Sequence, residues 1–410
     1  MQKEALWSKD FFLINISNFT SFLSYSLFVT VMALFVIDIG GTNQTTGLIT
    51  AGLTVTTMVC RPLVGKALDH YGRKPVFVTG GILFALNTVA YLFCHTLSSF
   101  AVVRIIHGIS QALFIVAVQT TAGDIIPESR LVEGLGFFGI SGSVAAALGP
   151  MTGLYIYEHY GVSKLFLVMS FFAAFGAFAA MLLHVKEKSA ILKSSNDTEE
   201  NTPKRETHVK LFSALFEPSA VFPGLYVLLM SFAYSLVSTF LTPCGLERGI
   251  NTVSLYFTVC SFVMMATRLF SGKVTLKIGL SRILSVGTVV MAGSIVMIAF
   301  AHSISMLIIS GVLYGISAGL IQPILQTLVF RFAPLKRRGS ATATYGLMED
   351  IGTGAGSAMW GSMTMSSGYT ASFLTSAAVM ALCGIEHLLI LRPKIVKMKD
   401  PVYFEDEDKP

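Results

Sequence analysis

The chain has 410 residues, of which 53% are hydrophobic and only 13% are charged, and its formal net charge at pH 7 is +6. So few charged side chains cannot cover the surface of a water-soluble protein of this length, whereas apolar runs of membrane-spanning length recur between residues 11 and 391. The composition therefore excludes a soluble globular protein and predicts an all-α integral membrane protein with many spans.

The apolar runs predict twelve transmembrane helices. In chain order they cover residues 11–37, 45–66, 74–93, 100–122, 133–157, 163–184, 219–242, 252–272, 281–301, 305–331, 340–364 and 370–391. The first run contains Asn15, Asn18 and several hydroxyl residues, which makes it too polar for the apolar centre of a cleavable signal peptide. We therefore expect a first helix that stays in the protein and faces a wet cavity.

Lysine and arginine lie mainly in every second connection between these runs. If the N-terminus is cytoplasmic, the outer connections hold only Lys164 and Arg248, and this asymmetry predicts that both termini are cytoplasmic. The basic residues lie in short connections beside helix ends, which suits topology and anionic lipid headgroups rather than nucleic acid. We expect a bacterial plasma membrane protein with no nucleic-acid partner.

A polar stretch between the sixth and seventh runs predicts a flexible cytoplasmic linker over residues 186–215. The predicted organisation is an N-terminal six-helix bundle over 1–185, this linker, a C-terminal six-helix bundle over 216–395 and a cytoplasmic tail over 396–410. The five cysteines have the spacing of neither a disulfide framework nor a zinc site, so no metal is expected.

The two halves repeat one another at a single offset of 207 residues, most visibly where the glycines at 65 and 72 recur at 272 and 279. The same offset pairs Arg61 with Arg268, Gly80 with Gly287, His95 with His302, Gly108 with Gly315, Gln119 with Gln326, Pro127 with Pro334, Gly139 with Gly346, Gly149 with Gly356 and Gly161 with Gly368. Six helices per half is an even number, so both halves enter the membrane in the same sense. The repeat predicts two parallel bundles with a central site between them.

Three segments resemble signatures of the major facilitator superfamily. The segment 65–74 is similar to the signature after that family's second helix, and it departs from the pattern at His70. Residues 104–112 resemble the fourth-helix motif, with His107 in place of the usual Gln, and residues 149–153 resemble the fifth-helix motif of exporters that exchange substrate for protons. The resemblance implies that family's fold and points to its twelve-helix drug/proton antiporter branch.

The segment 65–74 is predicted to be a tight charged turn. Its glycines allow close backbone approach, and Asp69 can accept hydrogen bonds from a helix N-terminus. The resemblance implies a partner near the start of the eleventh helix, at residues 340–343, and a latch that closes the cytoplasmic side. The expected gating residues are Gly65, Asp69, Gly72, Arg73 and Arg130. The alternative is a stable loop with no gating role.

Gly149, Pro150 and Gly153 make the fifth helix small-faced and interruptible, which predicts close helix packing. The resemblance adds a second role, in which the bend at these residues seals the outer half against leakage, as in antiporters.

Charged residues inside the predicted spans are candidates for proton coupling, because each is costly in the membrane unless it is paired or hydrated. Glu349 and Asp350 lie roughly 15 Å into the eleventh helix. At least one of them is predicted to carry protons, and the alternative is a structural carboxyl paired with an arginine. The ordinary roles of Arg104 are snorkelling toward the membrane surface and packing, and the resemblance implies instead that it modulates a proton carrier.

The sequence gives no support for an enzyme. It lacks a nucleotide-binding loop of the Gly-x-x-x-x-Gly-Lys-Ser/Thr type, metal-ligand spacing and a nucleophile elbow, so no cofactor is expected.

We therefore predict a proton-coupled exporter of small amphipathic molecules that works by alternating access. Its expected partners are a small-molecule substrate, protons and the lipid bilayer, and it is expected to function as a monomer. The predicted cavity residues, suited to loose apolar contact, are Asn18, Phe22, Tyr25, Tyr234 and Trp360. The alternatives are a proton-linked importer or facilitator of a metabolite, and a membrane receptor or lipid-handling protein that transports nothing.

Overall fold

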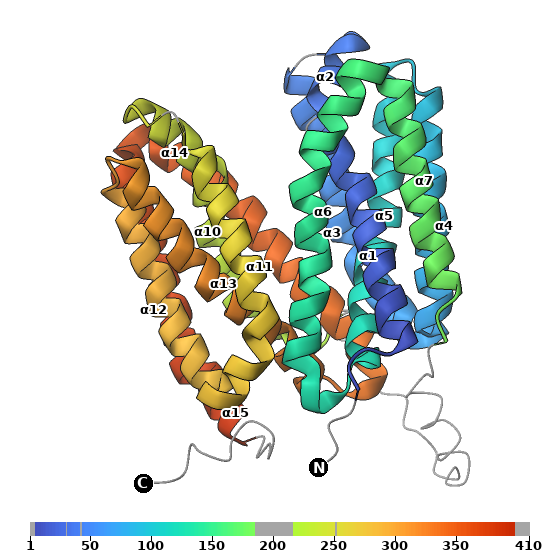
Figure 1. The fold of residues 1–410 in the computed structure, drawn as a ribbon. Coiled ribbons are helices and arrows are strands. Elements are labelled where there is room, and N and C mark those ends of the chain that lie inside the picture. Colours follow the sequence, from blue (N-terminus) through green and yellow to red (C-terminus); the bar gives the residue numbers. More distant parts are fainter. Residues whose placement is uncertain (1–4, 30, 42, 185–215, 251, 398–410) are drawn as a thin grey trace, which may run out of the picture. The chain divides into compact units, whose positions relative to one another are not determined.

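A computed structural model describes the chain except for residues 1–4, 30, 42, 185–215, 251 and 398–410 (Figure 1). Within the described residues the long helices are α1 (Lys9–Val29), α2 (Met32–Asp38), α3 (Asn43–Tyr71), α4 (Arg73–Ala90), α5 (Leu97–Ile125), α6 (Leu131–Tyr160), α7 (Val162–Met181), α10 (Val221–Glu247), α11 (Ser254–Ile278), α12 (Leu280–Ala299), α13 (Ile304–Phe332), α14 (Arg338–Glu386) and α15 (Arg392–Lys397). Shorter turns are η1 (Tyr91–Phe93), η2 (Glu128–Arg130), η3 (Pro218–Ala220), η4 (Leu335–Arg337) and the π-helical η5 (His387–Leu391). The predicted linker, and the predicted tail from residue 398 onward, lie outside the described residues.

Eleven helical stretches in the described residues are long and apolar enough to cross a membrane. The last of them, Leu335–Lys397, has 63 residues, which corresponds to roughly 95 Å of helix against a hydrocarbon layer of about 30 Å. Gly368 divides it, because its φ of 78° and ψ of 170° are not helical. The predicted all-α membrane fold is confirmed, and the break at Gly368 separates the eleventh span from the twelfth.

The chain divides into two compact units. Unit 1 comprises Met1–Pro127, Ile140–Glu217 and Ala333–Thr344, and unit 2 comprises Glu128–Gly139, Pro218–Phe332 and Tyr345–Pro410. In unit 1, α1 packs on α7, α3 packs on α5, and α4 packs on both α5 and α7. In unit 2, α13 packs on α10, α11 and α12. The first residues of α6 thus belong to unit 2, and the first residues of α14 belong to unit 1.

The sequence repeat extends to backbone geometry. Gly72 and its counterpart Gly279 have φ values of 92° and 91°, which allow the chain to reverse between two helices at a single residue. A Cβ atom at Gly108 would lie 2.7 Å from a backbone carbonyl of α3, and one at Gly315 would lie 2.7 Å from the corresponding carbonyl of α11. The two halves therefore use equivalent glycines for equivalent close contacts.

The prediction of a turn over 65–74 was wrong in its extent. Helix α3 continues to Tyr71 and α4 begins at Arg73, so only Gly72 leaves the helical conformation. The backbone from residue 65 to residue 71 is helical, and the charged side chains of this segment are compatible with a helix end. Gly65 and Asp69 therefore lie on the last turns of α3.

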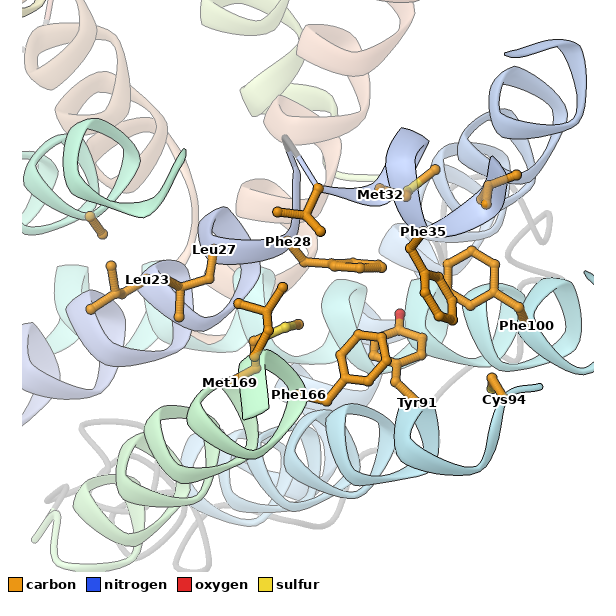
Figure 2. Packing of buried hydrophobic residues seen from close by; sticks show 14 residues of the cluster. Leu23, Leu27, Phe28, Met32, Phe35, Tyr91, Cys94, Phe100, Phe166 and Met169 are labelled. Carbon is orange, nitrogen blue, oxygen red and sulfur yellow. The ribbon is translucent and has the colours of Figure 1, made fainter. Parts of the chain in front are cut away.

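An aromatic cluster fills part of the core of unit 1 (Figure 2). Phe28, Phe35, Tyr91, Phe100 and Phe166 pack together with ring centroids 5.1 to 6.0 Å apart, in edge-to-face and tilted arrangements. Such pairs add about 0.5–1.5 kcal/mol each beyond the burial of apolar surface. The cluster joins α1, α2, α5, α7 and η1 into one packed body.

Candidate functional site

The carboxylate of Asp69 binds the start of α14 within unit 1. It accepts hydrogen bonds from the backbone N–H groups of Gly339 and Ser340, each at 2.8 Å, and from the Ser340 hydroxyl at 2.6 Å. A negative charge at a helix N-terminus is stabilised by the unpaired N–H groups and by the helix dipole. This helix start is where the resemblance implies a partner for Asp69, and the role of the contact as a latch stays a prediction.

Arg73 connects Asp69 to a second acid. Its guanidinium lies 3.0 Å from the Asp69 carboxylate and 2.9 Å from that of Asp124, and it also donates to the backbone carbonyls of Leu68 and Leu335. Arg338 donates to the other oxygen of Asp124 at 2.8 Å. Two buried arginines and two mostly buried aspartates thus alternate in one cluster at the ends of α3, α5 and α14.

Asp124 and Arg338 are not among the predicted gating residues. Asp124 lies just beyond the predicted end of the fourth helix, and Arg338 lies just before the predicted start of the eleventh. An acid at the cytoplasmic end of a predicted span is the signal that could have identified Asp124, because such a residue needs a basic partner.

Small residues make the contact between α3 and α14 possible. A Cβ atom at Gly65 would lie 2.7 Å from the Cβ atom of Ala343 and 2.9 Å from the Gly339 carbonyl. A Cβ atom at Gly339 would in turn lie 2.7 Å from Asp69 and from the Gly65 carbonyl. The two backbones therefore approach so closely that glycine is needed on both sides.

The structure does not bring all the predicted gating residues together in one unit. Gly65, Asp69, Gly72 and Arg73 belong to unit 1, whereas Arg130 belongs to unit 2. There the guanidinium of Arg130 binds both carboxylate oxygens of Glu133, at 2.7 and 2.8 Å.

The predicted antiporter-type segment packs tightly on α1 in unit 1. A Cβ atom at Gly149 would lie 2.2 Å from the Cβ atom of Ser26, and one at Gly153 would lie 1.8 Å from the Leu27 carbonyl. Pro150 lies inside α6. Close packing of this helix is therefore present, and a role in sealing the outer half stays a prediction.

Glu349 and Asp350 are half-buried residues of α14 within the last membrane-spanning stretch. Glu349 lies eleven positions after the first residue of α14, which corresponds to about 16 Å along the helix. Within unit 2 it is close enough to the buried Arg268 for an electrostatic interaction. Arg268 also donates to the Gly139 carbonyl at 2.8 Å and to the side-chain oxygen of Gln322.

Arg104 is packed in the core of unit 1, and a role in modulating a proton carrier stays a prediction. It is 4% exposed and lies among three rings of the aromatic cluster, with its guanidinium carbon 5.4 to 5.9 Å from their centroids. Its guanidinium contacts the Met32 sulfur and donates to the Tyr91 hydroxyl at 3.3 Å, and that hydroxyl lies 2.5 Å from Nδ1 of His107. The aromatic faces attract the cation and hold it in the core of unit 1.

The predicted cavity residues lie in different surroundings. Asn18 is buried and donates to the Ser141 hydroxyl at 2.8 Å. Phe22 and Tyr25 are half-buried neighbours on α1 in unit 1, with ring centroids 6.4 Å apart.

In unit 2, Tyr234 is half-buried and stacks on Tyr314 with ring centroids 5.0 Å apart. Trp360 is fully buried, and its indole N–H donates to the Phe232 carbonyl at 2.7 Å. Because no part of its side chain is exposed, Trp360 packs α14 on α10 in this structure and does not line an open cavity.

Comparison with known proteins gives consistent matches over most of the chain. The chain is 22% identical to the staphylopine export protein of Staphylococcus aureus over 89% of its own length and 90% of that protein. It is 24% identical to multidrug resistance protein 2 of Bacillus subtilis over 69% of this chain and 71% of that one.

Among solved structures, the fold resembles that of the Major Facilitator Superfamily transporter FucP in the outward conformation, with a TM-score of 0.75 at 15% identity over 92% of this chain and 97% of the other. The family model of the Major Facilitator Superfamily matches residues 14–280 and again 249–407. Together with the apolar spans and the repeated bundle helices, these matches establish that the chain is an integral membrane transporter that belongs to the Major Facilitator Superfamily.

Proposed function

We propose that this transporter exports small amphipathic molecules in exchange for protons. The observation that carries the proposal is an acid, Glu349, within a membrane-spanning helix beside the buried Arg268. A carboxyl group in such a position is stable either as a charged group next to a cation or as a neutral acid that holds a proton. Alternation between these two states provides a physical basis for coupling proton movement to a conformational change.

The direction of transport and the class of substrate are proposed from the relatives. One of them is named as an exporter and another as a multidrug resistance protein. A transporter that accepts many different substrates can bind them through loose apolar contacts. The half-buried aromatic residues Phe22, Tyr25 and Tyr234 supply apolar surface for such contacts.

In this proposal Glu349 carries the proton and Arg268 controls its charge. Arg268 has two other acceptors, the Gly139 carbonyl and Gln322. A shift of the guanidinium toward these acceptors leaves the carboxylate uncompensated and favours proton uptake, whereas its return favours proton release. Asp350 points about 100° away from Glu349 on the same helix and serves a separate role.

The contact between Asp69 and the start of α14 is proposed to act as a latch. Both groups of this contact can exchange their hydrogen bonds for water, so the contact can form and break at a modest cost in free energy. We further propose that two six-helix bundles are the functional halves of the protein. Both termini are proposed to be cytoplasmic, and the protein is proposed to function as a monomer.

The function is tested with purified protein in proteoliposomes that carry an imposed proton gradient. Ethidium, an amphipathic cation, is added as the probe, and the internal pH is followed with a trapped dye. Export in exchange for protons predicts that ethidium accelerates the collapse of the gradient. Ethidium transport at the same rate with and without a gradient argues against coupling, and gradient-driven movement in the direction of the protons identifies an importer.

The role of Glu349 is tested with the variants E349Q and D350N in the same assay. E349Q is expected to abolish the ethidium-dependent proton flux but to keep downhill ethidium movement, whereas D350N keeps measurable coupling. Full coupling in E349Q removes Glu349 as the carrier. Loss of coupling in D350N alone assigns the role to Asp350.

A further inference from the structure

A second buried acid in unit 2 has no role in the proposed transport cycle. Glu386, the last residue of α14, is 5% exposed, and both its carboxyl oxygens are buried without a hydrogen-bond partner among the described residues. A charged carboxylate is strongly disfavoured in such a buried place, because no donor among the described residues compensates its charge. The neutral acid needs no compensating cation.

The groups nearest to Glu386 on α14 and α10 are neutral. Cys383 precedes it by three residues on the same helix and is a free, buried thiol. From α10, the hydroxyl of Tyr226 lies close enough to interact with it and hydrogen-bonds to the Thr288 hydroxyl. Neither of these groups supplies the positive charge that an ionised carboxylate requires in an apolar interior.

The next residue, His387, connects this end of α14 to α12 through its side chain. It is fully buried, and its Nε2 atom lies 3.2 Å from the Ser281 hydroxyl of α12. Arg392, an exposed basic residue at the start of α15, interacts electrostatically with His387. His387 also begins the π-helical turn η5. Single π-helical turns within α-helices are rare and occur often at functional sites. Here the π-helical turn begins directly after the unpartnered acid Glu386.

We propose that Glu386 is a proton-binding site at the end of the last membrane span, separate from Glu349 and Asp350. In the present structure the carboxyl group is neutral and holds the proton. When this end of unit 2 becomes hydrated, the O–H bond breaks, the proton passes to water and the carboxylate remains with the bond's electron pair. His387 acts as a positioning residue through its contact with Ser281. The site does not depend on the drug/proton exchange proposed above.

The experiment is an infrared titration of the purified full-length protein in lipid nanodiscs between pH 5 and pH 9. A protonated carboxyl group gives a carbonyl-stretching band that is separate from the carboxylate bands. The wild-type protein is expected to show such a band at pH 7, and E386Q is expected to lose that component completely. E349Q is the matched control and is expected to keep it.

A band that is unchanged in E386Q overturns the proposal. E386D covers the case in which E386Q does not fold, because the shorter acid keeps a band but shifts its position, and an unshifted band also overturns the proposal. The titration is repeated with sodium chloride replaced by choline chloride at equal concentration. A midpoint that does not move supports a proton site, whereas one that moves with sodium replaces it by a metal-cation site.

Discussion

The same helix-end contact occurs once in each unit, and the charged groups at the two copies differ. In unit 1 the end of α3 meets the start of α14 at Gly65, and in unit 2 the end of α11 meets the start of α6 at Gly272. A Cβ atom at Gly272 would lie 2.3 Å from the Cβ atom of Glu133, so this contact is as close as that at Gly65. The repeat therefore preserves the backbone contact in both halves.

The charges differ at equivalent positions. Leu276 occupies the position of Asp69, and Arg331 occupies the position of Asp124. At the contact in unit 2 the Ser271 hydroxyl donates to the Val132 carbonyl at 3.4 Å, and Glu133 beside it pairs with Arg130 of the same segment. Close backbone packing is thus a property of the repeated fold, whereas the cluster that joins Asp69, Arg73, Asp124 and Arg338 is an addition in unit 1.

Removal of Asp124 is expected to have the largest effect. In D124N, Arg73 and Arg338, which are both buried, lose a charge partner. Breaking a buried ion pair from one side costs about 3–5 kcal/mol. For a folding unit of about 150–250 residues, each kcal/mol lowers the thermal midpoint by about 2–4 °C.

The measurement is thermal unfolding in nanodiscs, with E133Q as the matched control from unit 2. Glu133 forms an ion pair whose side chains are 22–25% exposed, so its loss is expected to change the midpoint by at most about 1–2 °C. Equal midpoints for the two variants would show that the charged cluster does not stabilise unit 1.

Removal of the charge on Asp69 is expected to loosen the start of α14. D69N keeps the size of the side chain but replaces one acceptor oxygen by a donor, so it cannot accept all three hydrogen bonds from residues 339 and 340. Hydrogen bonds to charged groups contribute about 1.5–3 kcal/mol, which corresponds to a roughly 10- to 100-fold increase in opening.

Opening is measured as maleimide labelling of a single cysteine introduced by A341C, a fully buried position, in a background without native cysteines. The control is L276N, at the equivalent position of unit 2, where the wild-type side chain is exposed and accepts no hydrogen bond. Unchanged labelling in D69N identifies the contact as a static part of the fold.

Alanine at the two contact glycines tests whether the shared backbone contact and the unshared charges are separable. G65A and G272A both force two helices apart, at a cost of about 1–3 kcal/mol. Both variants are expected to lower the thermal midpoint, but only G65A is expected to increase labelling at position 341. Increased labelling in G272A as well would show that the two contacts are energetically coupled.

The architecture was predictable because apolar length and repeated glycines are local signals. Each span requires its own apolar run, and the glycines that permit close approach recur at one offset in both halves. The turn at 65–74 was placed wrongly because charge was treated as a sign of a loop, whereas a helix end accommodates charged side chains. The eleventh and twelfth spans were predicted as separate runs, and the break between them lies at Gly368, which repeats Gly161; both glycines have positive φ values, 78° and 80°.

The charged cluster was only partly predictable, because pairing depends on tertiary contacts. Asp69 and its partner helix followed from a family resemblance, but the sequence does not specify that Asp124 and Arg338 meet across 214 positions. The sequence does not specify the surroundings of Arg104 for the same reason, since the aromatic residues around it come from three separate elements. The partner of a charge in a membrane protein becomes identifiable only when helix packing is known.

The smallest expected effect concerns the ion pair of Arg130, which is compared with the ion pair at the equivalent position of the other unit. Arg337, at the position equivalent to Arg130, lies 3.0 Å from the buried Glu217 in unit 1, whereas the partner of Arg130, Glu133, is 22% exposed. Exposed ion pairs three residues apart contribute about 0.2–0.5 kcal/mol, because water and salt screen them, and a pair with a buried acid contributes more. A double-mutant cycle of R130Q and E133Q is therefore expected to give a coupling energy below about 0.5 kcal/mol that vanishes at high salt. The matching cycle of R337Q and E217Q is expected to give a larger coupling energy that persists at high salt. Equal coupling energies in the two cycles would mean that the ion pair of Glu217 stabilises unit 1 no more than the ion pair of Glu133 stabilises unit 2.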